Sequence, residues 1–208
     1  MARAALIIAP QAPEQKPSRH LETRTKAVAL FARRGFAQVG LRELAAHLGI
    51  QPGSIYNHIE SKQALLFELI ESLYLDLLDI VATPAARASR SAEKRLDALI
   101  GAHLDLHRDK ADFFRVAEHE FHCLDDSQQT AVLELRRRYE SHLVKLLTPL
   151  GLSLDESLAR TTVRTFLCLL NNLPAWTDDA GLAPQGHRLL MQGIALGAVK
   201  GALASATR

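Results

Sequence analysis

Residues 51–58 carry the side chains with the clearest chemical potential in this sequence, the run Gln51-Pro52-Gly53-Ser54-Ile55-Tyr56-Asn57-His58. Amide and hydroxyl groups can hydrogen-bond base edges in the DNA major groove, which at about 12 Å is wide enough for one helix. Hydroxyl, imidazole and ammonium groups suit backbone phosphates. The pattern predicts a DNA-contacting surface of the following residues: Arg42, Gln51, Pro52, Gly53, Ser54, Tyr56, Asn57, His58 and Lys62.

Two short helices joined by a glycine turn must position this surface. Apolar residues of the stretch 41–48, of the turn and of the stretch 52–58 can fill a small wedge-shaped core, and the small Ala45 allows a close crossing. The core residues are Leu44, Ala45, Leu48, Ile50 and Ile55. This arrangement is a helix-turn-helix, with the second helix as the DNA reader.

Helical periodicity extends over the rest of the chain. The expected helices are 18–35, 41–48, 52–58, 61–80, 92–108, 110–123, 126–147, 153–175 and 184–204. We therefore predict an all-α protein of about nine helices. A flexible N-terminal arm (1–17) precedes a helix-turn-helix DNA-binding domain (18–66) and a helical ligand-binding and dimerisation domain (67–208).

Composition limits the class of protein. Hydrophobic residues make up 48% of the 208 residues and aromatics only 5%, which favours helices over β-sandwiches. Two cysteines cannot form a disulfide framework or a Cys₄ zinc site. No apolar run approaches the ~18 residues of a membrane span. We expect a cytoplasmic protein without a membrane partner.

The charge is uneven along the chain. Residues 1–62 contain nine Lys and Arg against four Asp and Glu, a net +5, whereas the other residues contain sixteen against nineteen, a net −3. A basic N-terminal part on a mildly acidic body indicates an anionic partner at one end.

Four stretches together resemble the TetR/AcrR family of transcriptional regulators. They are Ala29-Leu30-Phe31-Ala32-Arg33-Arg34-Gly35-Phe36, Leu41-Arg42-Glu43-Leu44-Ala45, Gly49 to His58, and Ser61-Lys62-Gln63-Ala64-Leu65. The resemblance implies a homodimer that binds a palindromic operator in double-stranded DNA and is released by a small ligand. The chain departs from the family pattern at Gly40 and Gln51, where hydroxyl caps are usual, and at Ile59, where an aromatic is typical.

The middle of the chain holds a candidate effector site. The family places a ligand cavity among these helices, and large apolar walls with a few polar groups suit such a cavity. We predict ligand contacts from Phe113, Phe114, Phe121, His122, Phe166, Asn171 and Trp176, with a place in the core as the alternative for most of them. The segments 112–116 and 136–140 resemble the KstR-like branch, which implies an acyl-CoA effector.

Histidines provide a rival interpretation. His103 and His107 are four residues apart, and His119 and His122 are three apart, so a transition metal could bind at this cluster. The alternative function is therefore an all-α metal-dependent enzyme or metal sensor. Because the sequence lacks a nucleophile elbow, a phosphate-binding loop and a recognised ligand motif, we predict no catalytic residues, no metal and no cofactor.

Three glycines recur every fourth residue in the last helix, at positions 193, 197 and 201. Each costs about 1 kcal/mol of helix stability relative to alanine, so a close helix approach must compensate. Packing against the 153–175 helix within the chain is one explanation. We favour a dimer interface at Gly193, Gly197 and Gly201.

Overall fold

The computed structural model describes residues 19–83, 91–177, 181 and 183–205, and all regular elements in these ranges are helices. The predicted all-α class is confirmed. The proposed arm at 1–17 lies outside the described residues. Among the helices described, none is long and apolar enough to span a membrane.

Three elements form a small N-terminal head: α1 (Arg19–Arg34), α2 (Leu41–Leu48) and the 3₁₀ helix η1 (Pro52–Asn57). Its core is the predicted wedge, since Leu44, Ala45 and Ile55 are at most 1% exposed and pack with Phe31. The turn after α2 depends on Gly49, whose φ of 72° is left-handed and therefore favours glycine.

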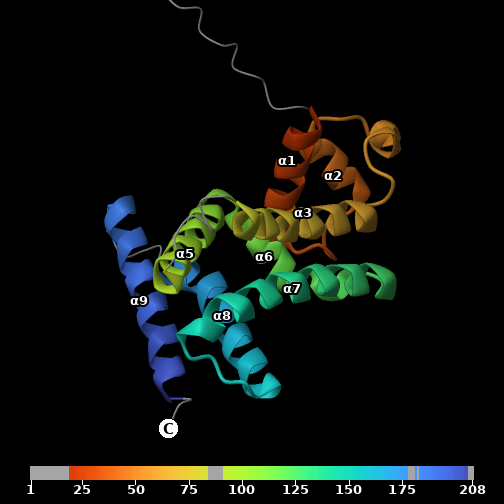
Figure 1. Cartoon of the computed structure of the whole chain (residues 1–208). Helices are drawn as coiled ribbons and strands as arrows, with labels where there is room; N and C mark the ends of the chain where they lie inside the picture. Colours follow the sequence, from red (N-terminus) through yellow and green to blue (C-terminus); the bar gives the residue numbers. More distant parts are fainter. Residues whose placement is uncertain (1–18, 84–90, 178–180, 182, 206–208) are drawn as a thin grey trace, which may run out of the picture.

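Helix α3 (Lys62–Ala82) runs from the head into the body of the molecule. Ser61 caps it, since its Oγ accepts a hydrogen bond from the Ala64 amide at 2.9 Å. Leucine and isoleucine side chains are buried along its length, and α3 packs against α7, α6 and α5. In Figure 1, α3 and α7 lie side by side across the middle of the molecule.

The remaining helices form the body, in which α9 packs on α5 and α8 at the side away from the head (Figure 1). They are α5 (Ala92–Asp109), α6 (Ala111–His119), η2 (Phe121–Cys123), α7 (Asp126–Leu147), η3 (Thr148–Leu150), α8 (Glu156–Thr177) and α9 (Pro184–Ser205). Arg188 of α9 donates two hydrogen bonds to Asp105 of α5, at 2.7 and 2.9 Å. These bonds hold the pKa of the Asp105 carboxyl below its usual value.

Each of the nine expected ranges contains a helix, but two differ in detail. The range 110–123 is broken at Glu120, whose φ of −109° and ψ of 2° leave the helical region, so that α6 ends and η2 begins. The segment predicted to contact DNA is a 3₁₀ helix and not an α-helix. It is only six residues long, contains Pro52 and Gly53, and has no side-chain cap, which together disfavour a longer helix.

Candidate nucleic-acid interface and buried polar centre

The predicted DNA-contacting residues form a mostly exposed surface on the head. Ile55 is buried and anchors η1, while Tyr56 is 63% exposed. Ser54 and Lys62 are half-buried, and the other predicted contacts are exposed: Arg42, Gln51, Pro52, Gly53, Asn57 and His58. The structure therefore exposes amide, imidazole, phenol and guanidinium groups around the buried Ile55 and the apolar core of the head.

Lys62 has a structural role that the sequence did not reveal. Its Nζ donates hydrogen bonds to the carbonyl oxygens of Phe36 at 2.9 Å and Val39 at 2.8 Å, and lies 4.2 Å from the centre of the Phe36 ring. These bonds join the start of α3 to the turn between α1 and α2. A phosphate contact from Lys62 stays a prediction, because the structure shows this ammonium group stabilising the head itself.

The expected lack of hydroxyl caps is confirmed. Gly40 precedes α2 and Gln51 precedes η1, and neither residue makes a side-chain cap hydrogen bond. The first backbone N–H groups of α2 and η1 consequently donate no hydrogen bond to a side chain at these two positions.

The predicted effector residues separate into two groups. Phe113, Phe114 and Phe166 are buried in the body among α5–α8, and Asn171 is half-buried beside them. Phe121 is only partly buried, on η2. The Trp176 side chain lies outside the described residues.

His122 lies apart from this buried group, and its ligand contact stays a prediction. The break at Glu120 turns the chain, so that His122 is exposed on η2, with its Nε2 3.4 Å from the Cys123 Sγ.

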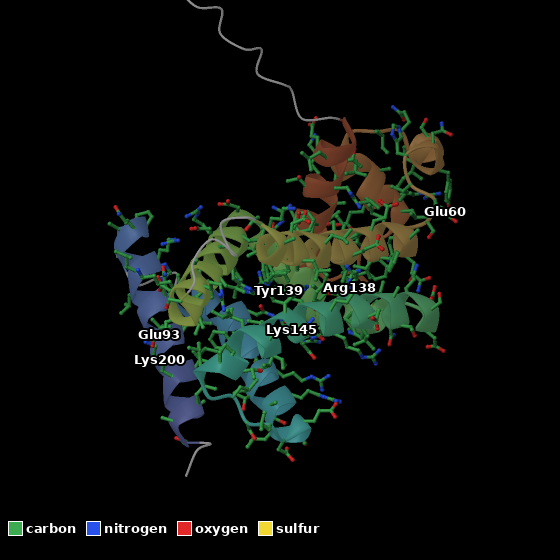
Figure 2. The ribbon with its side chains drawn as sticks, in the orientation of Figure 1. Glu60, Glu93, Arg138, Tyr139, Lys145 and Lys200 are labelled. Atoms are coloured by element: carbon green, nitrogen blue, oxygen red, sulfur yellow. The ribbon has the colours of Figure 1, made fainter. Side chains whose placement is uncertain are left out.

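A polar centre, which we define as His103, Tyr139, Asn171 and Glu118, lies in the body. The His103 imidazole of α5 is fully buried, with its Nδ1 3.1 Å from the hydroxyl of Tyr139 and its Nε2 3.1 Å from Oδ1 of Asn171. Asn171 Nδ2 donates to Glu118 Oε1 at 2.7 Å. Figure 2 labels Tyr139 on α7. One chain of hydrogen bonds thus joins α7, α5, α8 and α6.

These contacts assign the protons of the polar centre. Because the Asn171 amide nitrogen faces a carboxylate, its Oδ1 faces His103 and must accept from Nε2–H. Nδ1 of His103 then accepts from the Tyr139 hydroxyl. The neutral imidazole is therefore fully hydrogen-bonded, and burial lowers the pKa of His103 to about 4, with the nearby His107 acting in the same direction. Burial raises the pKa of Tyr139.

His107 is the second buried histidine of α5. Its Nε2 donates to the backbone oxygen of Asn171 at 2.9 Å, and its ring centre is 4.4 Å from that of Phe114. Burial lowers the pKa of His107 too. Phe114 thus packs against both imidazoles, which gives this apolar region two hydrogen-bonding neighbours.

The four histidines of the alternative metal-site interpretation do not come together. His103 and His107 face the interior, whereas His119, the last residue of α6, and His122 on η2 are exposed. Within the described residues, the group of three or more metal-ligating side chains that comes together is Glu120, His122 and Cys123. The spacing in sequence was misleading because the chain turns at Glu120.

The glycines of α9 face away from the other helices. A Cβ atom added to Gly193, Gly197 or Gly201 would meet none of the described residues within 4 Å. Packing against α8 within one chain therefore does not explain them.

Two protein-family models match this chain. The model described as "Bacterial regulatory proteins, tetR family" matches residues 25–69, and that described as "Tetracyclin repressor-like, C-terminal domain" matches residues 89–186. The chain belongs to the TetR family. It is thus a TetR-family helix-turn-helix transcriptional regulator.

Individual proteins of known sequence or structure are also similar to this chain. The transcriptional repressor KstR2 of Mycolicibacterium smegmatis is 32% identical over 84 residues, which are 37% of this chain and 41% of that protein. A TetR-family regulator from Bordetella parapertussis has the same fold, with a TM-score of 0.77 and 18% identity over 87% of this chain and 95% of that one. The structure of AibR in complex with isovaleryl coenzyme A and operator DNA also has this fold, with a TM-score of 0.71. Its sequence is 19% identical, and the match covers 85% of this chain and 97% of AibR.

The matched part spans less than half of the KstR2 relative, so the comparison identifies the family without extending that protein's ligand to this chain. Among the residues of the polar centre, the sequence pointed to Asn171 as a ligand contact but gave no role to Tyr139 or Glu118. The sequence did contain one sign of the polar centre: Tyr139 lies on the apolar face of its helix, and a buried phenol hydroxyl needs a hydrogen-bond partner.

Buried His103 should make this TetR-family protein less stable in acid. Its pKa is about 4 in the folded state against 6.5 when exposed, so the unfolded chain binds the proton more tightly and stability falls as the pH drops from 6.5 towards 4. Denaturant unfolding should show a loss of roughly 2 kcal/mol between pH 7 and pH 5 from this group.

The matched variants are His103→Gln and His119→Gln. His103→Gln should lose this part of the pH dependence, whereas His119→Gln, at an exposed position, should keep it. An unchanged pH dependence in His103→Gln would contradict the assigned neutral imidazole.

Proposed function

We propose that this chain is a ligand-responsive cytoplasmic repressor that binds a palindromic operator as a homodimer and is released by a small apolar or acyl-CoA-like effector. The observation that carries the proposal is the exposed polar row of η1, held over the buried Ile55. A helix presented in this way can enter a major groove, and a two-fold axis would supply the second half-site.

The head divides into base-reading and phosphate-contacting groups. We assign Gln51 and Asn57 to base edges, because their amides can donate and accept in pairs. Tyr56, His58 and Arg42 are suited to phosphates, and the net +5 of residues 1–62 favours a polyanion at this end. Domain boundaries at 18–66 and 67–208 belong to this proposal.

Substitutions on η1 should separate these two kinds of contact. Asn57→Ala should change the operator sequence selected from a random duplex library, since a good base contact is worth about 1–3 kcal/mol of discrimination. Tyr56→Phe should instead weaken binding to all duplexes alike, as measured by fluorescence anisotropy across a salt series. An unchanged selected sequence for Asn57→Ala would show that η1 is oriented differently.

The dimer proposal rests on an apolar surface shared by α8 and α9. Gly193, Gly197 and Gly201 lie on it as a shallow strip without side chains. Large apolar side chains are exposed on the same two helices: Leu158, Leu189, Leu190 and Ile194. Small residues flanked by leucine and isoleucine allow two helix pairs to approach closely and bury apolar area.

Gly197→Leu should convert the dimer into a folded monomer. A Cβ atom at position 197 meets no described residue of the same chain within 4 Å, and leucine has the higher helix propensity, so the fold should persist. Between chains the same side chain would block close approach. Sedimentation equilibrium is the measurement, with Ala131→Leu, at an exposed position on α7, as the matched control. A dimeric Gly197→Leu protein would place the interface elsewhere.

The effector proposal centres on the apolar region around Phe113, Phe114 and Phe166. The polar centre supplies imidazole, phenol and amide groups beside these rings. The local resemblance to the KstR-like branch and the acyl-CoA bound in the AibR structure support an acyl-CoA class of effector.

Helix α3 provides the mechanical connection. It begins at the head and packs along α7, α6 and α5. A ligand among the middle helices would push on α3 and change the separation of the two η1 helices. Two readers must lie about 34–36 Å apart to meet successive major grooves. The shift requires that the ligand bind one arrangement more tightly than the other.

Phe114→Trp should reduce the effector response and leave operator affinity intact. The larger ring would occupy space needed by the ligand. Operator release by isovaleryl coenzyme A, followed by anisotropy, is the assay, with Phe67→Trp as the control because Phe67 is only partly buried on α3. Native mass spectrometry of protein from its own host would show any retained ligand. Joint loss of folding and DNA binding in Phe114→Trp would identify Phe114 as core.

A further inference from the structure

Three side chains with metal-binding atoms, from η2 and the residue that precedes it, meet outside both sites described so far. The Sγ of Cys123 lies 3.4 Å from Nε2 of His122 and 3.7 Å from Oε2 of Glu120. All three potential ligand atoms lie within 4.8 Å of one another. This group was not predicted, because the sequence directed attention to four histidines.

The local backbone explains why these atoms converge. The amide of Cys123 donates to the carbonyl of Glu120 at 2.9 Å, a one-turn bond that brings residues three apart to the same side. Leu124 is buried and Phe121 packs against the core, so apolar anchors hold the turn from both sides. The arrangement is therefore fixed by the fold and not by the three polar side chains alone.

Two of the three separations between the ligand atoms fit a tetrahedral ion. Bond lengths of about 2.3 Å to sulfur and 2.0–2.2 Å to nitrogen or oxygen place neighbouring tetrahedral ligands about 3.6 Å apart. The two separations in the structure, 3.4 and 3.7 Å, lie on either side of that value. Thiolate and imidazole ligands favour zinc over magnesium or calcium, which prefer oxygen.

We propose that Glu120, His122 and Cys123 form a zinc-binding site with three protein ligands and an open fourth position. His122 is exposed, so water can occupy that position. Structural zinc sites generally have four protein ligands. A three-ligand site at the surface exchanges its ion with the medium more readily, as a site that responds to zinc supply requires.

The location couples the site to the head. A Cβ added to Gly35, which ends α1, would lie 3.6 Å from Oε1 of Glu120. Gln63, near the start of α3, donates a hydrogen bond to the carbonyl oxygen of Cys123 at 3.0 Å. Zinc would fix the turn that touches both helices, so amide hydrogen exchange around residues 35 and 63 should slow when the ion binds.

Zinc titration of the reduced, metal-free full chain tests the proposal, with a chromophoric chelator as competitor. The wild type should bind one zinc ion per chain, and magnesium should not compete. His122→Asn and Cys123→Ser should each weaken zinc binding by more than about tenfold. Removing a residue that only hydrogen-bonds to a metal ligand already lowers metal affinity by about tenfold or more, and these two residues are the proposed ligands themselves. The matched controls His119→Asn and Cys168→Ser, both at exposed positions, should bind as the wild type does.

Cobalt in place of zinc gives a second measurement. A thiolate-to-cobalt charge-transfer band should be present in the wild type and in Cys168→Ser, and absent in Cys123→Ser. Circular dichroism establishes that each variant is folded. Absence of stoichiometric zinc in the wild type, or wild-type affinity in folded His122→Asn and Cys123→Ser, would overturn the proposal. None of these measurements depends on operator binding, so failure of the zinc proposal can be distinguished from failure of the proposed function.

Discussion

The fully buried imidazole of His103 is the contact on which the body of this protein depends. An unpaired polar group in that position would cost several kcal/mol of desolvation, so the surrounding helices must supply partners. Tyr139 and Asn171 do so, and Asn171 is oriented in turn by Glu118. Four helices are consequently fixed in register by directional bonds, where apolar packing alone would tolerate small sliding movements.

The connection between head and body has a different character. Arg24 of α1 donates to the carbonyl oxygen of Glu68 on α3 at 3.1 Å, and Lys62 holds the α1–α2 turn. Lys110 pairs with Asp76, joining the start of α6 to α3. These are long side chains with charged ends, which can follow small displacements. The two parts also share apolar packing, because α1 packs on α6 and the buried apolar residues of head and body belong to one cluster.

Sequence periodicity predicted the helices well because each helix buries one face, and that face recurs every three or four residues. Gly49 marked its turn because a left-handed φ strongly favours glycine. Contacts between distant residues were not predictable in this way. His103 and Tyr139 are 36 residues apart, and nothing local to either indicates the other.

The candidate sites show the same limit. The exposed row on η1 followed from motif spacing, since Ile55 and its polar neighbours belong to one turn. The alternative four-histidine site does not form, because His103 and His107 of α5 point into the core whereas His119 and His122 are exposed at the end of α6 and on η2. The role of Lys62 inside the head was missed, since a lysine at the start of a helix looks the same in sequence whether it faces solvent or a carbonyl.

The glycine strip of α9 has a consequence for the thermodynamics of folding. Three glycines make the helix about 3 kcal/mol less stable than the same helix with alanines. Contacts with α5 and α8 compensate on one side only, through Met191, Ala195, Val199 and Leu203. In the proposed dimer the other side is stabilised by a second chain, which binds the folded state alone. The melting temperature would then rise with protein concentration, and α9 would be the first helix to fray on dilution.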